Sequence, residues 1–343
     1  MTERILFRKS GRIGLATLDR PQALNALDRA MCATLHRQLM EWILDDEVEA
    51  VVLEGNGRAF CAGGDIIEMH RIGRTAPSLW RQFFHDEYRL NQAIAHYPKP
   101  FVALADGIVM GGGVGISVHA PYRVVTENTL FAMPEAGIGM IPDVGSSHAL
   151  ARFPGEFGTF AALTGARITG ADCVALGYGS HYVPAAELDT LKERLAYSHE
   201  AVADVLDTFD TFDADDGALT LPALRDGIDY LFAQDQVEDI LSLLDDGDDW
   251  AREQARTLRQ HSPTSLKLAL HALREGDGAT VEQALRLEYR MVSALRTSHD
   301  FYEGVRAQLI DKDRQPRWKP ARLGDVDIAP YLRAPEWGDL GFD

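Results

Sequence analysis

Apolar positions near the start of the chain change from strand-like alternation to helical spacing. Residues 5–18 alternate apolar and polar side chains around Gly11, which predicts a strand, a turn and a second strand. Apolar residues then recur every fourth position from Leu27 to Ile43, so we expect a helix that begins near residues 25–28 and packs one face on a core. A short apolar run at 50–54 predicts a buried strand.

Strand and helix predictions continue along the chain. They place helices at 81–95, after Ser146 and from Ser262 to about Ile310, a buried strand at 101–105, and two further short strands at 122–126 and 129–132. Strands interspersed with helices predict an α/β fold, with a twisted sheet covered by helices. We expect one compact domain in three parts, namely a core (1–200), an acidic helical segment (201–260) and a C-terminal helical region (261–343) that completes it.

Residues 200–250 are strongly acidic. They contain sixteen Asp or Glu residues and one basic residue, Arg225, interspersed with apolar positions. This pattern is typical of amphipathic helices with solvated acidic faces, so we do not expect a ligand site there.

Composition narrows the classes of function. The net charge of the 343 residues is -18, which argues against a nucleic-acid binder, because such proteins neutralise phosphates with basic side chains. Three cysteines without metal-ligand spacing favour a reducing compartment over a disulfide framework or a zinc site. No apolar run approaches the roughly 20 residues needed to cross a bilayer, and the amino end lacks a signal-peptide pattern. We expect a soluble, cytoplasmic protein with no nucleic-acid or membrane partner.

Two carboxylates stand in an apolar stretch, residues 131–143, that prolines interrupt. Pro134 precedes Glu135 and Pro142 precedes Asp143, so neither acid is expected inside a regular helix. Acids in such surroundings are costly to bury unless the charge has a partner or a function. Either each acid caps the start of a helix, or the two acids face a reaction centre.

Two glycine-rich turns, Ala62–Gly64 and Gly111–Gly113, each follow a predicted strand and precede a predicted helix. Backbone N–H groups at a helix start can converge on an anionic oxygen, as an oxyanion hole requires. Tight helix packing is the other explanation for these glycines. Neither turn is a phosphate-binding loop, because no Gly-Lys-Ser or Gly-Lys-Thr follows, and neither completes a dinucleotide fingerprint.

A nucleophilic serine is not indicated. The chain has no Gly-x-Ser-x-Gly sequence, which weighs against an α/β serine hydrolase. Ser147 and His148 lie close to Asp143 in sequence, but neighbouring residues of a helix point in different directions. Glu135 and Asp143 remain the candidates for acid, base or nucleophile.

These segments together resemble the crotonase (enoyl-CoA hydratase/isomerase) superfamily, and within it the 3-hydroxyisobutyryl-CoA hydrolase branch. The resemblance covers nearly the whole chain and is weakest across residues 200–250. The segments that carry it are 59–65, 110–115, 131–135, 142–145, 262–267, 299–306, 309–313 and 318–320.

The resemblance implies a crotonase-like spiral of ββα units with a helical C-terminal region, assembled as a homo-oligomer of trimers or their multiples. It implies that the N–H groups of Gly64 and Gly112 bind the thioester oxygen. The superfamily's catalytic acids fall on Glu135 and Asp143, and its substrate contacts fall on Glu87 and Gly112. No metal and no cofactor are implied, since coenzyme A is part of the substrate.

The implied reaction is hydrolysis of a short β-hydroxyacyl-CoA, namely 3-hydroxyisobutyryl-CoA of valine breakdown, to 3-hydroxyisobutyrate and CoA. Glu135 would attack the carbonyl or activate a water, and both routes are open. Asp143 would orient that water or protonate the leaving thiolate, and Glu87 would hold the β-hydroxyl.

Two alternatives have a feature against them. Hydratases carry a second catalytic glutamate where this chain has Gly115, which counts against an enoyl-CoA hydratase or isomerase. A non-catalytic acyl-CoA-binding relative would not need Glu135 and Asp143.

The phosphates of coenzyme A need local compensation on an acidic protein. The candidates are Arg20, the helix start after Gly64 and the basic residues of 312–319. Hydratases often carry Lys or Arg where this chain has Ile67.

Overall fold

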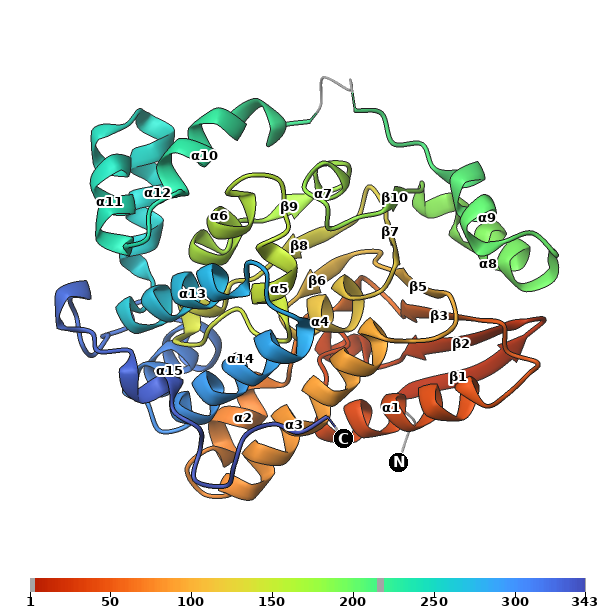
Figure 1. Cartoon of the computed structure of the whole chain (residues 1–343), viewed down its shortest axis with the longest axis horizontal. Helices are drawn as coiled ribbons and strands as arrows, with labels where there is room; N and C mark the ends of the chain where they lie inside the picture. The colour runs from red at the N-terminus through yellow and green to blue at the C-terminus, as the bar shows by residue number, and fades with distance from the viewer. Residues whose placement is uncertain (1–3, 215–218, 343) are drawn as a thin grey trace. The chain divides into compact units, whose positions relative to one another are not determined.

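The computed structural model describes residues 4–214 and 219–342 (Figure 1). The chain divides into two compact units. The first unit comprises Met1–Gly64, Arg89–Phe131 and Arg167–Ala223, and the second comprises Asp65–Tyr88, Ala132–Ala166 and Leu224–Asp343. Each unit is therefore assembled from segments that are separated in the sequence. The division into three consecutive parts stays a prediction.

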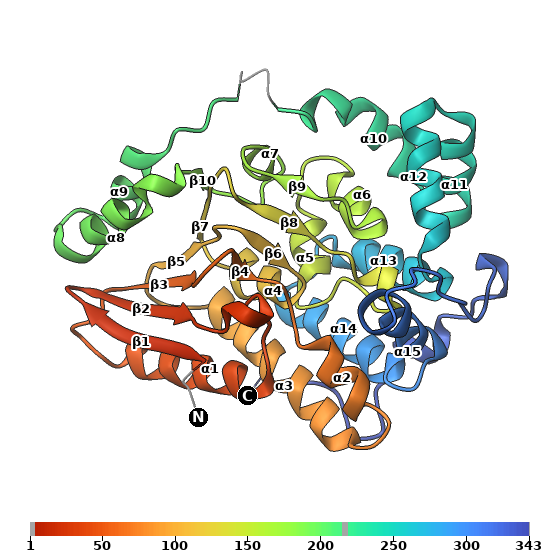
Figure 2. The ribbon, with the colours of Figure 1, turned by 180° about the vertical axis from the view of Figure 1, so that it is seen from behind.

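The first unit contains two sheets. A six-stranded sheet has the order β1-β2-β3-β5-β7-β10, and a four-stranded sheet has the order β4-β6-β8-β9 (Figures 1 and 2). The strands are β1 (Ile5–Ser10), β2 (Ile13–Leu18), β3 (Ala50–Gly55), β4 (Ala59–Cys61), β5 (Phe101–Leu104), β6 (Ile108–Met110), β7 (Tyr122–Val125), β8 (Leu130–Ala132), β9 (Ile168–Thr169) and β10 (His181–Tyr182). The helices are α1 (Arg29–Ile43), α4 (Gly112–Val118), α7 (Asp172–Ala175), α8 (Leu188–Tyr197) and α9 (Val202–Phe209), with short 3-10 helices at Pro21–Ala23, Ala185–Glu187 and Pro222–Leu224.

The larger sheet is mostly parallel. β1 and β2 form the predicted antiparallel hairpin, and β2, β3, β5, β7 and β10 then run parallel to one another. The register pairs Ile13 with Ala50 and Val51 with Phe101. Parallel neighbours require crossover connections, and the intervening helices supply them. The predicted α/β fold is confirmed.

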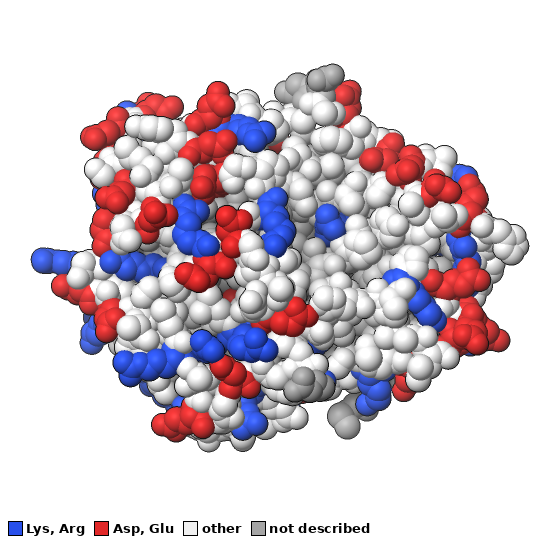
Figure 3. Space-filling model, in the orientation of Figure 1, with Lys and Arg blue, Asp and Glu red and all other residues white. Residues whose placement is uncertain are grey.

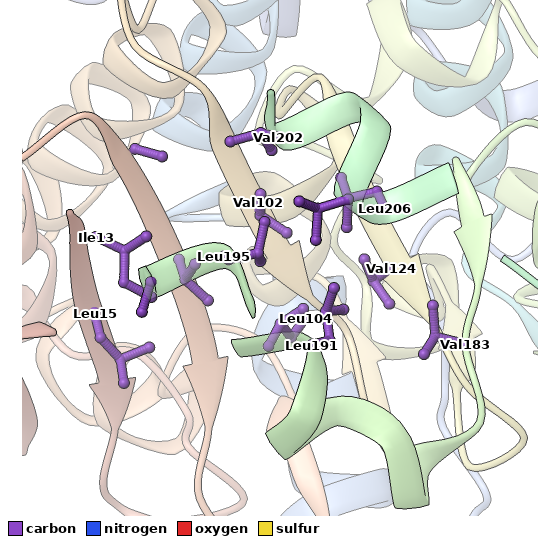
Figure 4. Packing of buried hydrophobic residues seen from close by; sticks show 14 residues of the cluster. Ile13, Leu15, Val102, Leu104, Val124, Val183, Leu191, Leu195, Val202 and Leu206 are labelled. Atoms are coloured by element: carbon purple, nitrogen blue, oxygen red, sulfur yellow. The ribbon is translucent and has the colours of Figure 1, made fainter. Parts of the chain in front are cut away.

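Successive residues of β2 face opposite sides of the larger sheet. Ile13 and Leu15 belong to a buried cluster on one side, which also contains Leu195 of α8 and Leu206 of α9 (Figure 4). Gly14, between them, faces the ring of Trp42 at the end of α1, where an added Cβ would come within 2.7 Å of the ring. The sheet is therefore covered on both faces, which explains the nearly continuous apolar sequences of its strands.

The second unit is helical. Its helices are α2 (Ile66–Ile72), α3 (Pro77–Ala95, which continues into the first unit), α5 (Ser146–Leu150), α6 (Phe157–Thr164), α10 (Arg225–Phe232), α11 (Val237–Asp246), α12 (Asp249–Gln260), α13 (Pro263–Gly276), α14 (Val281–Leu295) and α15 (His299–Val305). Shorter helical turns are η2 (Glu135–Ile138), the π-helix η5 (Arg306–Ile310), η6 (Leu323–Asp325) and η7 (Ala329–Leu332). Over the described residues, the predicted helices after Ser146 and from Ser262 to Ile310 are confirmed, and they are divided by caps such as Ser262, Thr280 and Ser298.

The acidic segment forms amphipathic helices, as predicted. Helices α9, α10, α11 and α12 bury apolar side chains such as Val205, Ile228, Ile240 and Leu258. Figure 3 shows Lys and Arg side chains interspersed with Asp and Glu on the face drawn. None of the helices in the described residues has the length and apolar character needed to span a membrane.

Candidate acid cluster and glycine turns

Three buried glutamates of the second unit each interact with a buried aspartate, Asp143. Glu87 lies on α3, Glu135 begins η2, Asp143 precedes α5, and Glu288 lies in the middle of α14. The charge of Asp143 raises the pKa of each of the three glutamates. Because like charges resist ionising together in a buried site, such clusters favour at least one protonated member.

Glu135 is buried without a partner for one of its carboxyl oxygens. It begins a 3-10 helix, so Pro134 excludes a regular α-helix here but permits a short turn closed by the Gly137 N–H on the Pro134 carbonyl at 3.1 Å. Oε2 of Glu135 has no hydrogen-bond partner among the described residues. Burial and then the charge of Asp143 raise the pKa of Glu135 well above its ordinary value. An unpaired buried oxygen of this kind indicates a ligand or reacting group.

Asp143 accepts a hydrogen bond from the hydroxyl of Tyr88, with 2.6 Å between the oxygens. Burial raises its pKa to about 6, against the lowering effect of that bond. The capping interpretation is wrong for this residue, because α5 starts at Ser146 and its N-cap residue is Gly145 with no capping side chain of its own. Asp143 is therefore poised to titrate near neutral pH.

Glu87 is the third acid predicted for the site, and it lies on α3 directly before Tyr88. Its side chain is 2% exposed, and its Oε1 has no hydrogen-bond partner among the described residues. Burial, followed by the charge of Asp143, raises its pKa well above the ordinary value. The structure thus brings Glu87, Glu135 and Asp143 together.

Glu288 and Tyr88 were not predicted as site residues. The carboxylate of Glu288 accepts hydrogen bonds from the N–H of Gly145 (2.6 Å) and from the N–H and hydroxyl of Ser147 (2.9 and 2.6 Å). Burial raises the pKa of Glu288 to about 8, although these bonds lower it. The partners of both residues lie far away in sequence, so no local motif marked them.

The Ser147–His148 pair does not form part of a triad. The hydroxyl of Ser147 donates to Glu288, whereas Nδ1 of His148 lies 2.9 Å from the carbonyl oxygen of Ala279. The two side chains have different partners, as their adjacent places on α5 predicted. Among residues 4–214 and 219–342, no group of three His, Cys, Asp or Glu side chains has the arrangement of a metal site.

The two glycine turns lie against each other in the first unit. A Cβ added to Gly63 would come 3.2 Å from the Met110 carbonyl oxygen and 3.6 Å from the Gly112 nitrogen. A Cβ on Gly113 would come 2.1 Å from the Cys61 carbonyl oxygen. Close packing therefore explains these two glycines, as one of the sequence interpretations expected.

Gly64 and Gly112, the predicted oxyanion donors, occupy favourable backbone positions. Gly112 is the first residue of α4, where an N–H has no acceptor within its own helix. Gly64 forms an isolated parallel bridge with Leu27, whose N–H donates to the Gly63 carbonyl at 2.8 Å, so this bond does not use the N–H of Gly64. The N–H of Gly112 is therefore not used within α4, and the bridge to Leu27 does not use the N–H of Gly64.

A pocket of about 790 Å³ lies beside α2 in the second unit. It is lined by Asp65, Ile67, Glu68, His70, Arg71, Arg74, Thr75, Tyr302 and Ile310. The Arg74 guanidinium carbon lies 3.7 Å from the centre of the Tyr302 ring, and Arg71 is largely exposed. The lining also includes two acids, and Arg71 lies 3.9 Å from the Glu68 carboxylate. An anionic ligand would therefore compete with Glu68 for Arg71 and with the Tyr302 ring for Arg74.

The three sites predicted for the phosphates of the ligand differ in whether their groups already have partners within the protein. The start of α2 is occupied by the carboxylate of Asp65, which accepts the Glu68 N–H at 3.1 Å, so an acid already caps this helix. Arg20 donates to the Ala26 carbonyl at 2.9 Å. The basic side chains of 312–319 are exposed and follow Ile310 of the pocket.

Comparisons with known proteins agree with the predicted superfamily. The family described as Enoyl-CoA hydratase/isomerase matches residues 13–331. Among similar proteins, "3-hydroxyisobutyryl-CoA hydrolase, mitochondrial" of Danio rerio is 44% identical over 330 residues (94% of this chain and 86% of the relative). The protein of the same name from Homo sapiens is 42% identical over 351 residues (99% and 91%).

Solved structures show the same fold. The crystal structure of a carnitinyl-CoA dehydratase from Mycobacterium thermoresistibile has a TM-score of 0.93 and 40% identity, and it covers 100% of this chain and 99% of that one. An enoyl-CoA hydratase from Rhodobacter sphaeroides has a TM-score of 0.89 and 40% identity, with 99% and 100% covered. The resemblance inferred from the motifs is confirmed, and the chain belongs to the enoyl-CoA hydratase/isomerase family.

Proposed function

We propose that this protein hydrolyses the thioester of 3-hydroxyisobutyryl-CoA to 3-hydroxyisobutyrate and free coenzyme A, a step of valine breakdown. The observation that carries the proposal is similarity above 40% over nearly the whole chain to proteins named 3-hydroxyisobutyryl-CoA hydrolase. The buried pair of Glu135 and Asp143 supports it, since burial raises the pKa of Asp143 to about 6 and the pKa of Glu135 well above its ordinary value.

In the proposed mechanism the N–H groups of Gly64 and Gly112 bind the thioester oxygen. Negative charge develops on that oxygen as the carbonyl carbon is attacked, and each such donor is worth about 10²–10³ in rate. The C–S bond then breaks, and a proton reaches the thiolate of coenzyme A, so that water is consumed and one acid and one thiol are formed.

Glu135 and Asp143 divide the proton transfers. Glu135 either takes a proton from the attacking water or attacks the carbonyl carbon itself, and its unpaired Oε2 is available for both routes. In the second route Glu135 and the acyl group form an anhydride as the C–S bond breaks, and water then hydrolyses this anhydride to the free acid and the Glu135 carboxyl group. Asp143 orients the water or protonates the thiolate, for which a pKa of about 6 is suitable. Glu87, with its unpaired Oε1, would accept a hydrogen bond from the β-hydroxyl of the acyl group.

The experiment is a pair of assays on one enzyme preparation. Release of free thiol from 3-hydroxyisobutyryl-CoA is followed beside the loss of crotonyl-CoA absorbance. Thiol release that falls at least about 100-fold in both Glu135→Gln and Asp143→Asn supports the proposal. Near-native thiol release by both variants contradicts it.

Enoyl-CoA hydration is the second candidate, because the two solved structures at 40% identity are named as a dehydratase and a hydratase. Position 115, where the resemblance places a hydratase's second glutamate, is a buried glycine in α4. Loss of the crotonyl absorbance without thiol release would favour this alternative, and silence in both assays would favour an acyl-CoA-binding protein.

The pocket beside α2 is the proposed site for the phosphates and adenine of coenzyme A. Arg71 and Arg74 would pair with phosphate, and the Tyr302 ring, which Arg74 covers in this structure, would receive the adenine once Arg74 turns to the phosphate. This assignment replaces the helix start after Gly64, whose end Asp65 occupies. Arg74→Ala should raise KM for the CoA ester about tenfold while kcat changes little, and an unchanged KM would reject the assignment.

Location and assembly remain predictions. We predicted a cytoplasmic protein, whereas the relatives carry the word mitochondrial in their names. The absence of a metal or cofactor requirement is tested by thiol release after dialysis against a chelator. A trimer or a multiple of trimers is tested by light scattering, which resolves multiples of the 37.9 kDa chain.

A further inference from the structure

Glu288 is the one member of the acid cluster that the proposed mechanism does not use. Its side chain is fully buried on α14, and it is directed at the segment that follows Asp143. A buried carboxylate is expensive unless its oxygens are satisfied, so its retention calls for an explanation.

The carboxylate of Glu288 caps a helix to which it does not belong. Helix α5 begins at Ser146 and receives no cap from its own N-cap residue, Gly145. Glu288 supplies the missing acceptor, since its Oε2 binds the Gly145 N–H and its Oε1 binds both the N–H and the hydroxyl of Ser147.

The segment that Glu288 holds is strained. Val144 has a φ of 59° and Gly145 a φ of 79°, so two successive residues adopt the left-handed conformation. This conformation is a genuine outlier for a β-branched residue such as Val144. Strained residues persist only where the surroundings over-determine them, and they cluster at functional sites. Asp143 immediately precedes Val144, the strained residue of this segment.

We infer that Glu288 is a positioning residue for Asp143, because it clamps the start of α5 and thereby holds the strained turn that carries the Asp143 carboxylate. Tyr88 holds the same carboxylate from α3, so Asp143 is fixed from two elements. The inference rests on the proposed function for the role of Asp143, but the clamp itself does not depend on which reaction is catalysed.

The first test is Glu288→Gln. A glutamine of the same shape offers one acceptor oxygen and one NH2 group, so an N–H of Gly145 or Ser147 would face a donor. We expect kcat for thiol release to fall about 30-fold while KM changes less than about threefold, because displacement of a catalytic group affects the transition state more than binding. A parallel rise in KM with unchanged kcat overturns the inference.

A double-mutant cycle with Asp143→Asn separates positioning from a general structural effect. If Glu288 acts through Asp143, adding Glu288→Gln to the Asp143→Asn variant should change kcat less than about threefold. Independent effects that multiply would overturn the inference. Should Glu288→Gln fail to fold, Ser147→Ala replaces it in the cycle, because it removes one of the three donors and leaves the carboxylate in place.

Asp172→Asn is the matched control. The carboxylate of Asp172, in the first unit, also binds two backbone N–H groups and one hydroxyl, those of Thr220 and Leu221. Asp172→Asn should lower the free energy of unfolding about as much as Glu288→Gln does, but its kcat should stay within about twofold of that of the unmodified protein. An equal loss of kcat in both variants would show that any buried cap has this effect and would overturn the inference.

Amide hydrogen exchange keeps the clamp testable if the proposed function fails. In Glu288→Gln, exchange at Gly145 and Ser147 should be at least about tenfold faster than in the unmodified protein, whatever the enzyme hydrolyses. Unchanged exchange overturns the clamp. Absence of thiol release from the unmodified protein would instead reject the proposed function, and the cycle would then be measured on crotonyl-CoA hydration.

Discussion

The hydroxyl of Tyr88 lies 2.6 Å from Oδ2 of Asp143, and Tyr88→Phe removes that donor while keeping the buried ring. A donor to the ionised carboxylate lowers its pKa, so its loss should move the pKa of Asp143 upward from about 6. The limb of the pH–rate profile that belongs to Asp143 should therefore move to higher pH, by about one unit, whether Asp143 acts as acid or base. The measurement is kcat for thiol release between pH 5 and 9.

Tyr178→Phe is the control for this prediction. Tyr178 is also a fully buried tyrosine, and its hydroxyl lies 2.8 Å from the Ser117 hydroxyl in the first unit. Tyr178→Phe should leave the pH of the Asp143 limb of the pH–rate profile unchanged. A limb that does not move in Tyr88→Phe would mean that Asp143 does not govern that limb.

Individual residues differed in how far their role was visible in the sequence. Glu135 and Asp143 were found because acids stand out in an apolar stretch interrupted by prolines. Glu288 was missed because its partners lie more than 140 positions away. One signal was present: Glu288 is three residues after Leu285 and four before Val292, both buried, so helical spacing places it on the apolar face of α14.

At the scale of elements, η2 decides where Glu135 lies. Substitution of the glycine within η2, Gly137, and of the glycine that ends it, Gly139, should have different effects. Gly139 has a φ of 72°, and a Cβ there would lie 2.1 Å from the Asp300 carbonyl oxygen. Gly139→Ala should lower the free energy of unfolding by at least about 2 kcal/mol and also lower kcat, because η2 must shift. In Gly137→Ala the added Cβ would contact only the His261 ring, at 3.5 Å, so the free energy of unfolding should change by less than about 1 kcal/mol. Urea denaturation of both variants checks the difference, and equal losses would contradict it.

Element types were largely predictable, whereas their ends and short turns were not. The hairpin at 5–18 and the helix opened by Asp28 follow from local periodicity and a capping side chain. Helix α3 begins at Pro77, four residues before the predicted start, because proline is well placed in a first helical turn. The 3-10 helix at Glu135 needs only one-turn hydrogen bonds, which an apolar pattern does not reveal.

At the scale of the whole molecule, the salt dependence of KM should distinguish the repulsion of substrate by the net negative charge from its attraction by nearby arginines. The net charge of -18 repels an anionic substrate, while Arg71 and Arg74 attract it locally. Salt screens both, with a Debye length of about 10 Å at 0.1 M. KM of the unmodified protein should rise with NaCl, whereas KM of an Arg71→Ala/Arg74→Ala variant should fall. The control variant Arg252→Ala/Arg256→Ala removes the same charge from α12 and should behave as the unmodified protein. If KM changed with NaCl in the same direction in the unmodified protein and in the Arg71→Ala/Arg74→Ala variant, the two arginines would not be the groups that attract the substrate.

The interleaving of the two units was beyond the sequence patterns. Local periodicity reports which face of an element is buried, not which distant segment covers it. Residues 65–88 join 132–166 and 224–343 through contacts such as Tyr88 with Asp143, which no spacing rule relates. The motifs could still be assigned to one family, because the glycine turns and acids are short local sequences.

Asp143 connects the proposed chemistry to the stability of the whole molecule. Its pKa rises from an ordinary 3.8 to about 6 in the folded protein, so the folded state holds this proton more tightly than the unfolded state. Its contribution to stability is therefore present at low pH and is lost as the pH rises through this window. Asp143→Asn has no such loss, so the free energy of unfolding of the variant minus that of the unmodified protein should grow by up to about 3 kcal/mol between pH 4 and pH 7. Removing the charge also lowers the pKa of Glu87 and Glu135, which acts in the same direction. Urea denaturation at the two pH values measures the difference, and a constant difference would show that Asp143 ionises in the fold without cost.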